Sequence, residues 1–214
     1  MPTYSVCKSF QWRGRVSDKV ARVCRMFGLT VEVLGERIVT HECRVEINDG
    51  DIVYITGPSG AGKSVLLREL QNAVPAEERI DLGEVELPGD RTLIDCIEGG
   101  VLGGLRTLSI AGLNDVFCIL NQPANLSKGQ KYRFRLAMAL AARKKFIFAD
   151  EFCSELDRVT AAVVSYNIHR FAKRTGTAFV LASSHDDILL DLAPDVVVVK
   201  ELSGPAQVIY RESS

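Results

Sequence analysis

A glycine-rich run of eight residues separates a short apolar segment, Asp51–Thr56, from a helical pattern over Val65–Asn72. The run fits G-x4-G-K-[ST], which forms a phosphate-binding loop when it joins a strand to a helix. Its glycines let backbone amides surround phosphate oxygens, and the helix N-terminus adds partial positive charge. The residues expected to contact a nucleoside triphosphate are Gly57, Pro58, Ser59, Gly60, Ala61, Gly62, Lys63, Ser64 and Val65.

Two residues of this loop have predicted chemical roles. Lys63 is expected to reach the β- and γ-phosphates, and the Ser64 hydroxyl is expected to ligate Mg²⁺. The loop by itself does not separate a kinase, a GTPase and an ATPase, so the choice depends on the rest of the chain.

Composition places the chain among ordinary globular proteins. It has 214 residues, 47% hydrophobic and 25% charged, with a formal net charge of −1, which excludes disordered and collagen-like classes. No apolar run approaches the roughly 20 residues that cross a bilayer, and no secretory signal is visible. Six cysteines are scattered without a CxxC pair, which favours reduced thiols over a zinc site. We expect a soluble, cytoplasmic protein.

Apolar strands alternate with helices along most of the chain. This order predicts an α/β fold with a mostly parallel sheet flanked by helices, and an antiparallel β part near the N-terminus. We expect a single domain, residues 1–214. The predicted helices are 17–27, 65–72, 128–143 and 158–173, and the predicted strands are 29–33, 38–40, 44–47, 51–56, 92–97, 146–149, 178–182, 196–200 and 207–210.

Four further segments follow the loop in a fixed order. They are Leu126-Ser-Lys-Gly-Gln130 before a helix, Asp150-Glu151 at the end of an apolar strand, Ser154-Glu-Leu-Asp157, and His185 after another strand. With the phosphate-binding loop, this set resembles the ABC-type ATPases, whose fold is a P-loop NTPase fold with a small helical signature subdomain. The resemblance implies that this subdomain lies at about residues 74–145. The resemblance covers about residues 31–199. It is nearest to soluble ABC-type ATPases found alone or fused to an acetyltransferase domain.

The resemblance and the chemistry of the residues together predict the roles in hydrolysis. Asp150 is expected to hold Mg²⁺, and Glu151 to act on the attacking water as general base or polariser; otherwise the two acids solvate a strand end. His185 is expected to contact the γ-phosphate, or else to be a hydrogen-bonded structural histidine. Asp157 either crosses a dimer interface or caps the following helix.

The resemblance also implies a second copy of the chain. Ser127, Gly129 and Gln130 stand at a helix N-terminus, which is a natural anion site. In the family, that anion is the γ-phosphate held by the other subunit's phosphate-binding loop. The implied active unit is therefore a head-to-tail homodimer that closes on two ATP molecules with Mg²⁺ and opens after hydrolysis.

Some positions depart from the family pattern. The adenine-stacking aromatic falls near Leu34, which predicts only a weak preference for ATP over GTP. The glutamine expected between residues 93 and 104 is absent, and Asp95 or Glu98 are the candidates to replace it beside Mg²⁺. Lys128 replaces the first glycine of the signature.

The partner is the open part of the functional hypothesis. We expect a soluble ATPase that couples nucleotide-driven closure to an unidentified protein partner. The alternatives are the ATP-binding subunit of a membrane transporter, with a permease as the less expected partner, and a DNA-associated clamp. Basic residues gather near the N-terminus and in residues 128–145, which fits either a nucleic-acid contact or a solvated helix face.

Overall fold

A six-stranded sheet in the order β4-β5-β6-β3-β7-β8 forms the centre of the molecule. The computed structural model describes residues 2–212. Neighbouring strands run parallel from β4 to β7, and β8 is antiparallel to β7. The strands are β3 (Ile52–Thr56), β4 (Arg79–Asp81), β5 (Phe146–Ala149), β6 (Ala178–Ala182), β7 (Val196–Val199) and β8 (Gln207–Tyr210).

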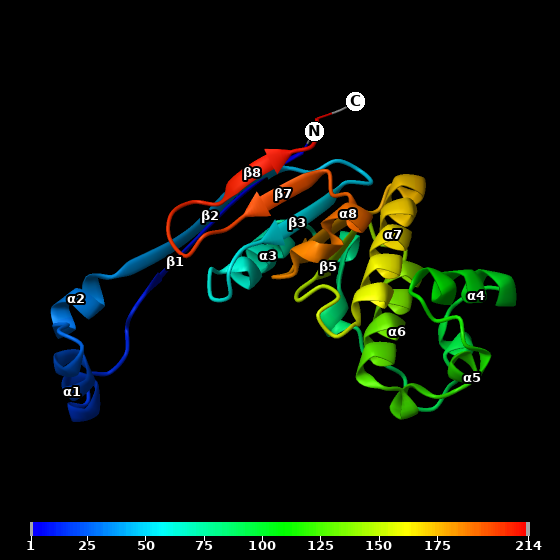
Figure 1. Cartoon of the computed structure of the whole chain (residues 1–214), viewed down its shortest axis with the longest axis horizontal. Coiled ribbons are helices and arrows are strands. Elements are labelled where there is room, and N and C mark those ends of the chain that lie inside the picture. Colours follow the sequence, from blue (N-terminus) through cyan, green and yellow to red (C-terminus); the bar gives the residue numbers. More distant parts are fainter. Residues whose placement is uncertain (1, 213–214) are drawn as a thin grey trace.

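Helices cover both faces of this sheet (Figure 1). One buried cluster joins the sheet to α6 and α7, and a second joins the other face to α3 and to a separate two-stranded ribbon. The helices are α1 (Asp18–Met26), α2 (Val31–Glu36), α3 (Lys63–Asn72), α4 (Val101–Ile110), α5 (Val116–Ile119), α6 (Lys128–Ala141), α7 (Arg158–Thr175) and α8 (Leu189–Leu192). Short 3₁₀ turns are η1 (Ala76–Glu78), η2 (Leu82–Glu84), η3 (Ile94–Cys96), η4 (Pro123–Asn125) and η5 (Asp186–Ile188). The expected α/β architecture with a mostly parallel sheet is confirmed.

The ribbon consists of β1 (Thr3–Gln11) and β2 (Ile38–Glu46), paired antiparallel from Thr3 with Glu46 to Gln11 with Ile38. Its inward side chains alternate along β2, where His41, Cys43 and Val45 are buried. The two short strands predicted at 38–40 and 44–47 are thus parts of one continuous strand. Figure 1 shows the ribbon running past α3 and ending in α1 and α2, which stand apart from the body.

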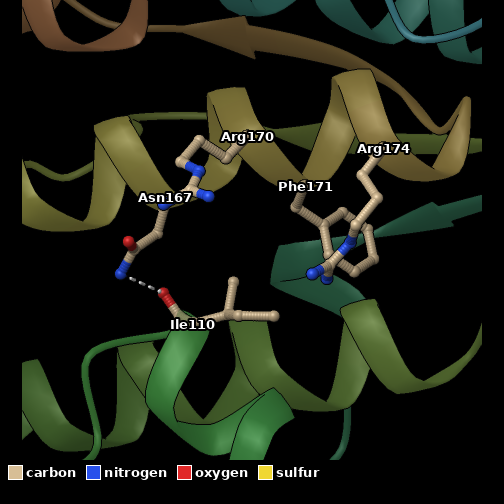
Figure 2. A pocket seen from close by; sticks show the side chains of 5 residues that line it. All are labelled: Ile110, Asn167, Arg170, Phe171 and Arg174. Carbon is tan, nitrogen blue, oxygen red and sulfur yellow. Dashed lines mark hydrogen bonds between the residues drawn. The ribbon is translucent and has the colours of Figure 1, made fainter.

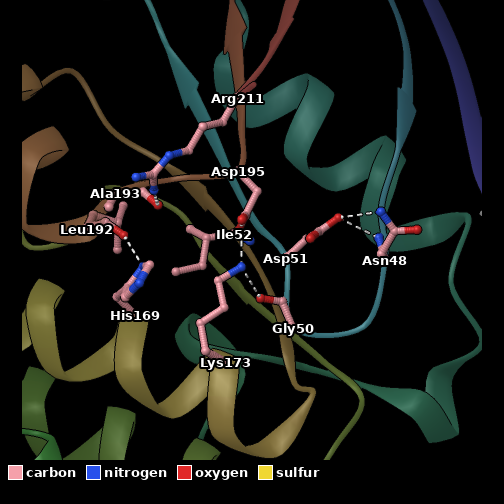
Figure 3. A network of polar contacts seen from close by, with 10 residues as sticks. All are labelled: Asn48, Gly50, Asp51, Ile52, His169, Lys173, Leu192, Ala193, Asp195 and Arg211. Carbon is pink, nitrogen blue, oxygen red and sulfur yellow. Dashed lines mark hydrogen bonds and ion pairs between the residues drawn. The ribbon is translucent and has the colours of Figure 1, made fainter. Parts of the chain in front are cut away.

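Lys173 and Asp195 tie the end of α7 to the sheet (Figure 3). The Lys173 ammonium lies 2.6 Å from Oδ1 of Asp195 and donates to the carbonyl of Gly50 at 3.1 Å. The other carboxylate oxygen of Asp195 accepts from the amide of Ile52 at 2.8 Å, where β3 begins. These contacts fix the start of the strand that leads into the phosphate-binding loop.

Two predicted strands are wrong, and local hydrogen bonds explain both. Residues 29–33 were expected as a strand, but the Thr30 hydroxyl accepts from the amide of Val33 at 3.3 Å and caps helix α2. Residues 92–97 were also expected as a strand, but they contain the 3₁₀ turn η3, because the Thr92 hydroxyl donates to the Asp95 carboxylate at 2.6 Å and accepts from its amide at 3.4 Å. Short polar side chains thus replace strand pairing with local turns.

No helix within residues 2–212 is long and apolar enough to cross a membrane. Residues 82–145, between β4 and β5, contain α4, α5 and α6. The smaller subdomain expected at about 74–145 stays a prediction.

Candidate functional site

The glycine-rich loop joins β3 to α3 and turns sharply at three glycines. Gly57, Gly60 and Gly62 have φ values of 140°, 80° and 97°, which side chains rarely adopt. Gly62 is also the N-cap of α3, so the loop opens directly onto a helix N-terminus. Loop amides and the helix end therefore face the same space, which suits an anion.

Close packing from outside holds this loop in place. A Cβ added to Gly57 would come 2.0 Å from the carbonyl oxygen of Lys200, at the end of β7. A Cβ added to Gly62 would come 2.2 Å from the His41 ring on β2. Burial and the nearby Lys200 lower the pKa of His41, which favours the neutral imidazole against the loop.

The side chain of Lys63 folds back across the loop. Its ammonium donates to the carbonyls of Gly57 at 2.8 Å and Pro58 at 3.1 Å. This position holds a positive charge at the mouth of the loop, within reach of a bound phosphate.

A pocket of about 240 Å³ brings the loop together with the acids that follow β5. Asp150 and Glu151 both line it, and the Glu151 amide donates to the Asp150 carboxylate at 3.0 Å. Glu151 has a φ of 49°, so its backbone adopts a left-handed conformation uncommon for this residue type. The lining consists of Ser59, Gly60, Gly62, Lys63, Ser64, Val65, Asp150, Glu151, Ser183 and Ser184.

A second cavity, of about 370 Å³, shares Ser64 and Asp150 and extends to Asp81. Asp81 ends β4, next to β5, and its carboxylate accepts from the amide of Gly83 at 2.7 Å. Burial raises the pKa of Asp81, with Glu84 and Asp150 adding like charge. The motifs did not single out Asp81, because the residues before it, Glu77-Glu78-Arg79-Ile80, form no apolar run.

The expected metal-side residue Asp95 lies elsewhere. It is exposed on the turn η3, bonded to Thr92, and neither cavity includes it or Glu98 in its lining. Within residues 2–212, no three His, Cys, Asp or Glu side chains are grouped as a metal site of their own. Ser64 and Asp150 line both cavities, where Glu151 joins them on one side and Asp81 and Glu84 on the other.

Leu34 is likewise distant from the loop. It lies in α2, at the outer end of the ribbon, whereas the loop meets the ribbon at His41 (Figure 1). The loop pocket does not include Leu34 in its lining. The expectation of weak base selectivity therefore loses its structural basis.

His185 follows β6 and is fixed through its backbone. The Tyr54 hydroxyl on β3 donates to the carbonyl of His185, and the His185 amide donates to the Ser183 hydroxyl at 3.2 Å. Ser183 and Ser184 line the loop pocket, while the His185 side chain is exposed at its edge. The two strands that end at this edge, β3 and β6, are neighbours in the sheet.

Ser127 caps α6 at a different place on the molecule. Its hydroxyl accepts from the Gln130 amide at 3.3 Å, and its own amide donates to the Gln130 side chain at 2.9 Å. A Cβ added to Gly129 would come 3.3 Å from the carbonyl of Glu155, so this helix tip packs against the segment before Asp157. The loop pocket of the same chain does not include Ser127 in its lining.

Asp157 caps α7. Its carboxylate accepts from the Thr160 amide at 3.0 Å and from the Thr160 hydroxyl at 2.7 Å. These hydrogen bonds lower the pKa of Asp157. The capping alternative is therefore present in the structure, and an interface role stays a prediction.

Several basic residues of the 128–145 cluster have partners within the fold. Arg133 donates to the carbonyl of Gly112 at 2.7 Å, and Lys144 donates to that of Glu77 at 2.7 Å. Lys145 lies 3.6 Å from the Asp49 carboxylate. These contacts favour a structural role for part of the cluster over a nucleic-acid surface.

Another pocket, of about 250 Å³, lies between the end of α4 and one side of α7 (Figure 2). Asn167 donates to the carbonyl of Ile110 at 3.1 Å there, beside Arg170 and Arg174. None of the predicted site residues lines it.

Comparison with known proteins identifies what the chain is similar to. A family model described as ABC transporter matches residues 40–96. The aliphatic sulfonates import ATP-binding protein of Yersinia pestis is 30% identical over 190 residues, which cover 78% of this chain and 69% of that protein. The methionine import ATP-binding protein of Streptococcus agalactiae is 29% identical over 73% of this chain and 54% of that protein.

Solved structures agree on the fold. The dimeric bacterial ABC transporter cassette MJ0796 superposes with a TM-score of 0.66 at 20% identity, over 84% of this chain and 94% of that one. The chain spans 54–69% of the length of the two curated relatives named above. Both relatives are import proteins. The expected similarity to stand-alone or acetyltransferase-fused ATPases therefore has no support. The expectation that a membrane permease is the less favoured partner has no support either.

Proposed function

Since the chain belongs to the ABC transporter family of ATP-binding proteins, we propose that it binds and hydrolyses Mg²⁺-ATP between two copies of itself. The observation that carries the proposal is the pocket in which Lys63, Ser64, Asp150 and Glu151 meet at the N-terminus of α3. A triphosphate there meets loop amides, a lysine and two carboxylates, which are the groups that phosphoryl transfer to water requires.

The donor set of this pocket fits Mg²⁺. Ser64 supplies a hydroxyl and Asp150 a carboxylate on the same cavity wall, and Asp81 lies on the adjoining cavity. Mg²⁺ prefers oxygen ligands and is commonly held by one or two carboxylates together with substrate phosphates. When bound, the ion would neutralise charge on the phosphate oxygens.

The protein's own residues supply the remaining chemistry. Lys63 offsets charge on the β- and γ-phosphates, and loop amides fix their position. Glu151 orients and polarises the attacking water, because it lines the same pocket one residue beyond Asp150. His185, anchored by Tyr54 at the edge of the pocket, contacts the γ-phosphate side.

The second copy supplies the other half of the site. Ser127 and the N-terminus of α6 form an anion-binding helix end outside the loop pocket of their own chain. Head-to-tail pairing places this helix end over the triphosphate of the partner. ATP binding then closes the dimer and hydrolysis reopens it.

The relatives suggest the larger assembly in which this ATPase works. They are ATP-binding proteins of sulfonate and methionine import, which favours a role as the ATP-binding subunit of a membrane transporter, at the cytoplasmic face. A soluble ATPase with another protein partner, or a nucleic-acid clamp, are the competing roles.

The first test replaces Glu151 by Gln. The variant should bind ATP with wild-type affinity, lose at least about a hundredfold in turnover, and run as a dimer with ATP on size exclusion. Ser154→Ala, close in sequence but outside the pocket lining, is the matched control. A fully active, monomeric Glu151→Gln protein would contradict both the water-activating role and the dimer.

The second test identifies the partner. The ATP-trapped Glu151→Gln protein should recover an integral membrane protein from detergent-solubilised membranes of the source cells. Recovery of soluble proteins alone would contradict the transport role. DNA-stimulated hydrolysis that weakens as salt rises would favour the clamp instead.

A further inference from the structure

The ribbon ends in a projecting element, residues 12–37, which we call the arm. It contains α1 and α2, and within these residues only Cys24 is buried. Several large apolar side chains are instead open to solvent, among them Val23, Met26 (75% exposed) and Phe27 (76% exposed). Exposed apolar groups gathered on so small an element mark an interaction surface.

The arm is also strongly basic. Arg13, Arg15, Lys19, Arg22 and Arg25 occur within thirteen residues that contain one acid, Asp18. No ion pair found within residues 2–212 involves any of these five side chains. The surface that covers the arm should therefore be apolar and bordered by acids.

The arm lies beyond the phosphate-binding loop, at the opposite end of the molecule from α4, α5 and α6 (Figure 1). Side chains of the ribbon connect the loop to the arm. The His41 ring packs against Gly62 of the loop, and the Phe10 ring, which is nearer the arm, lies 5.8 Å from the His41 ring. A partner that covers the loop from outside therefore comes next to the arm.

In the head-to-tail dimer, on which this inference rests, the partner covers the loop with its Ser127. The residues just before Ser127 form α5 and the turn η4. On and directly after α5, three large apolar side chains are exposed: Val116, Phe117 (81% exposed) and Leu120. This apolar group, the α5 surface, accompanies Ser127 wherever it docks.

Acids border the α5 surface. Asp115 caps α5 through the Phe117 amide at 2.9 Å, and the Leu93 amide donates to the Asn121 carbonyl at 3.0 Å, which attaches η3 to the end of α5. Asp95 and Glu98, at and after η3, are exposed on that segment. The α5 surface thus matches the arm in apolar character, and Asp115, Asp95 and Glu98 offer it charges of opposite sign.

We propose that the arm of each copy packs on the α5 surface of the other copy when ATP closes the dimer. Phe27, Met26 and Val23 then leave water, and the arginines of α1 meet the acids around α5. The arm is thereby a clasp that holds the partner's signature helix over the nucleotide.

Removal of the arm tests this directly. Gln11 and Ile38 pair across the ribbon, so Asn-Gly in place of residues 12–37 closes a two-residue hairpin without a register change. In the Glu151→Gln background with ATP, the deletion should raise the dimer dissociation constant at least about tenfold, since a few buried apolar anchors dominate such contacts. Unfolding temperature and nucleotide binding should stay unchanged.

The deletion separates the two proposals. A Glu151→Gln protein with an intact arm that stays monomeric with ATP would refute the dimer itself. A dimer that forms equally well without the arm would refute only the clasp.

A cysteine pair tests the place of contact. With Cys7→Ser as background, Phe27→Cys plus Phe117→Cys should form an intermolecular disulfide with ATP and much less without it. Phe27→Cys plus Leu190→Cys is the matched control, because Leu190 is 93% exposed on α8. Equal cross-linking in both pairs, or none in the first, would overturn the assignment.

Charge reversal tests the electrostatic part. Arg22→Glu with Arg25→Glu should weaken the ATP-bound dimer and reduce the dependence of its affinity on salt. Unchanged affinity at every salt concentration would count against the acids around α5. Arm-dependent binding of the nucleotide-free protein to vesicles rich in phosphatidylglycerol, without any arm effect on dimer affinity, would assign the arm to a membrane surface instead.

Discussion

The phosphate-binding loop and the arm both follow directly from a strand, but they are held in opposite ways. The loop is pressed from outside by Lys200 and His41, and its conformation leaves no room for side chains at Gly57 or Gly62. The arm buries one residue, Cys24, and leaves large apolar side chains such as Met26 and Phe27 exposed. Packing within the chain fixes the first connection, whereas the second has a surface that only another molecule can complete.

The largest difference between the two regions should appear in ATP binding when one methyl group is added to each of them. Gly57→Ala places a Cβ 2.0 Å from the carbonyl of Lys200 at a φ of 140°, so ATP binding should be lost. Gly35→Ala meets nothing within 4 Å in α2 and should leave binding unchanged. Calorimetric titration with ATP measures both. Normal binding by Gly57→Ala would mean that the loop is not held as described.

Replacing one phenylalanine in the body and one in the arm compares how much each region contributes to the free energy of unfolding. Phe148 on β5 is fully buried, and Phe148→Ala should lower the free energy of unfolding by about 3–5 kcal/mol. Phe27→Ala, in the arm, should change it by less than about 0.5 kcal/mol in the nucleotide-free monomer. Urea unfolding gives both values. A large loss for Phe27→Ala would show that the arm packs on its own chain.

Asp81 sharpens the comparison within the body, because stability and binding should change in opposite directions. Because the pKa of Asp81 is raised in the folded protein, its ionised form opposes folding. The contribution of Asp81 to stability is most favourable below its ordinary pKa of 3.8, and it is lost as pH rises through its pKa in the folded protein. At pH 7, Asp81→Asn should therefore raise the unfolding temperature of the nucleotide-free protein.

The same substitution should weaken ATP binding by up to about tenfold with Mg²⁺, and not at all with EDTA. Glu84→Gln, on the same cavity but farther along the chain, is the control. Equal binding by Asp81→Asn under both conditions would remove Asp81 from the metal side of the pocket.

The smallest expected effect concerns helix caps. Asp157→Ala removes the acceptor for two Thr160 donors and should lower the unfolding temperature slightly. Since the hydrogen bonds lower the pKa of Asp157, their contribution is present above the ordinary carboxyl pKa and lost as pH falls through the lowered one. Ser17→Ala, the cap of α1 in the arm, should leave global unfolding unchanged at either pH. Circular dichroism melts at neutral and acidic pH compare them.

Sequence patterns predicted the elements whose own residues carry the signal. The loop, β3, β5, β6 and the helices α6 and α7 follow from glycine spacing, apolar runs and caps such as Gly176. The strand predicted at 29–33 failed because Thr30 acts as a cap, a choice that depends on what its apolar neighbours can pack against. In the arm, Leu29 and Val33 stay exposed, so burial of these side chains does not favour a strand.

The position of Asp81 beside the site could not be predicted from the sequence, because it depends on contacts between distant segments. Asp81 lies beside Asp150 only because β4 pairs with β5, which are separated by more than sixty residues. Leu34 was placed by counting back from the loop without gaps, and the structure has it in α2 of the arm instead of on the ribbon beside the loop. Short motifs thus locate groups near in sequence, whereas strand pairing decides which distant groups meet.

Trp12 is the single tryptophan of the chain, and it stands at the base of the arm, folded over Gly14. Selectively excited tryptophan fluorescence therefore reports on the surroundings of Trp12 alone, without any attached label. Stopped-flow emission after mixing with ATP can follow the arm in real time, separately from phosphate release. The order of the two signals would reveal whether the clasp opens before or after the bond to the γ-phosphate breaks.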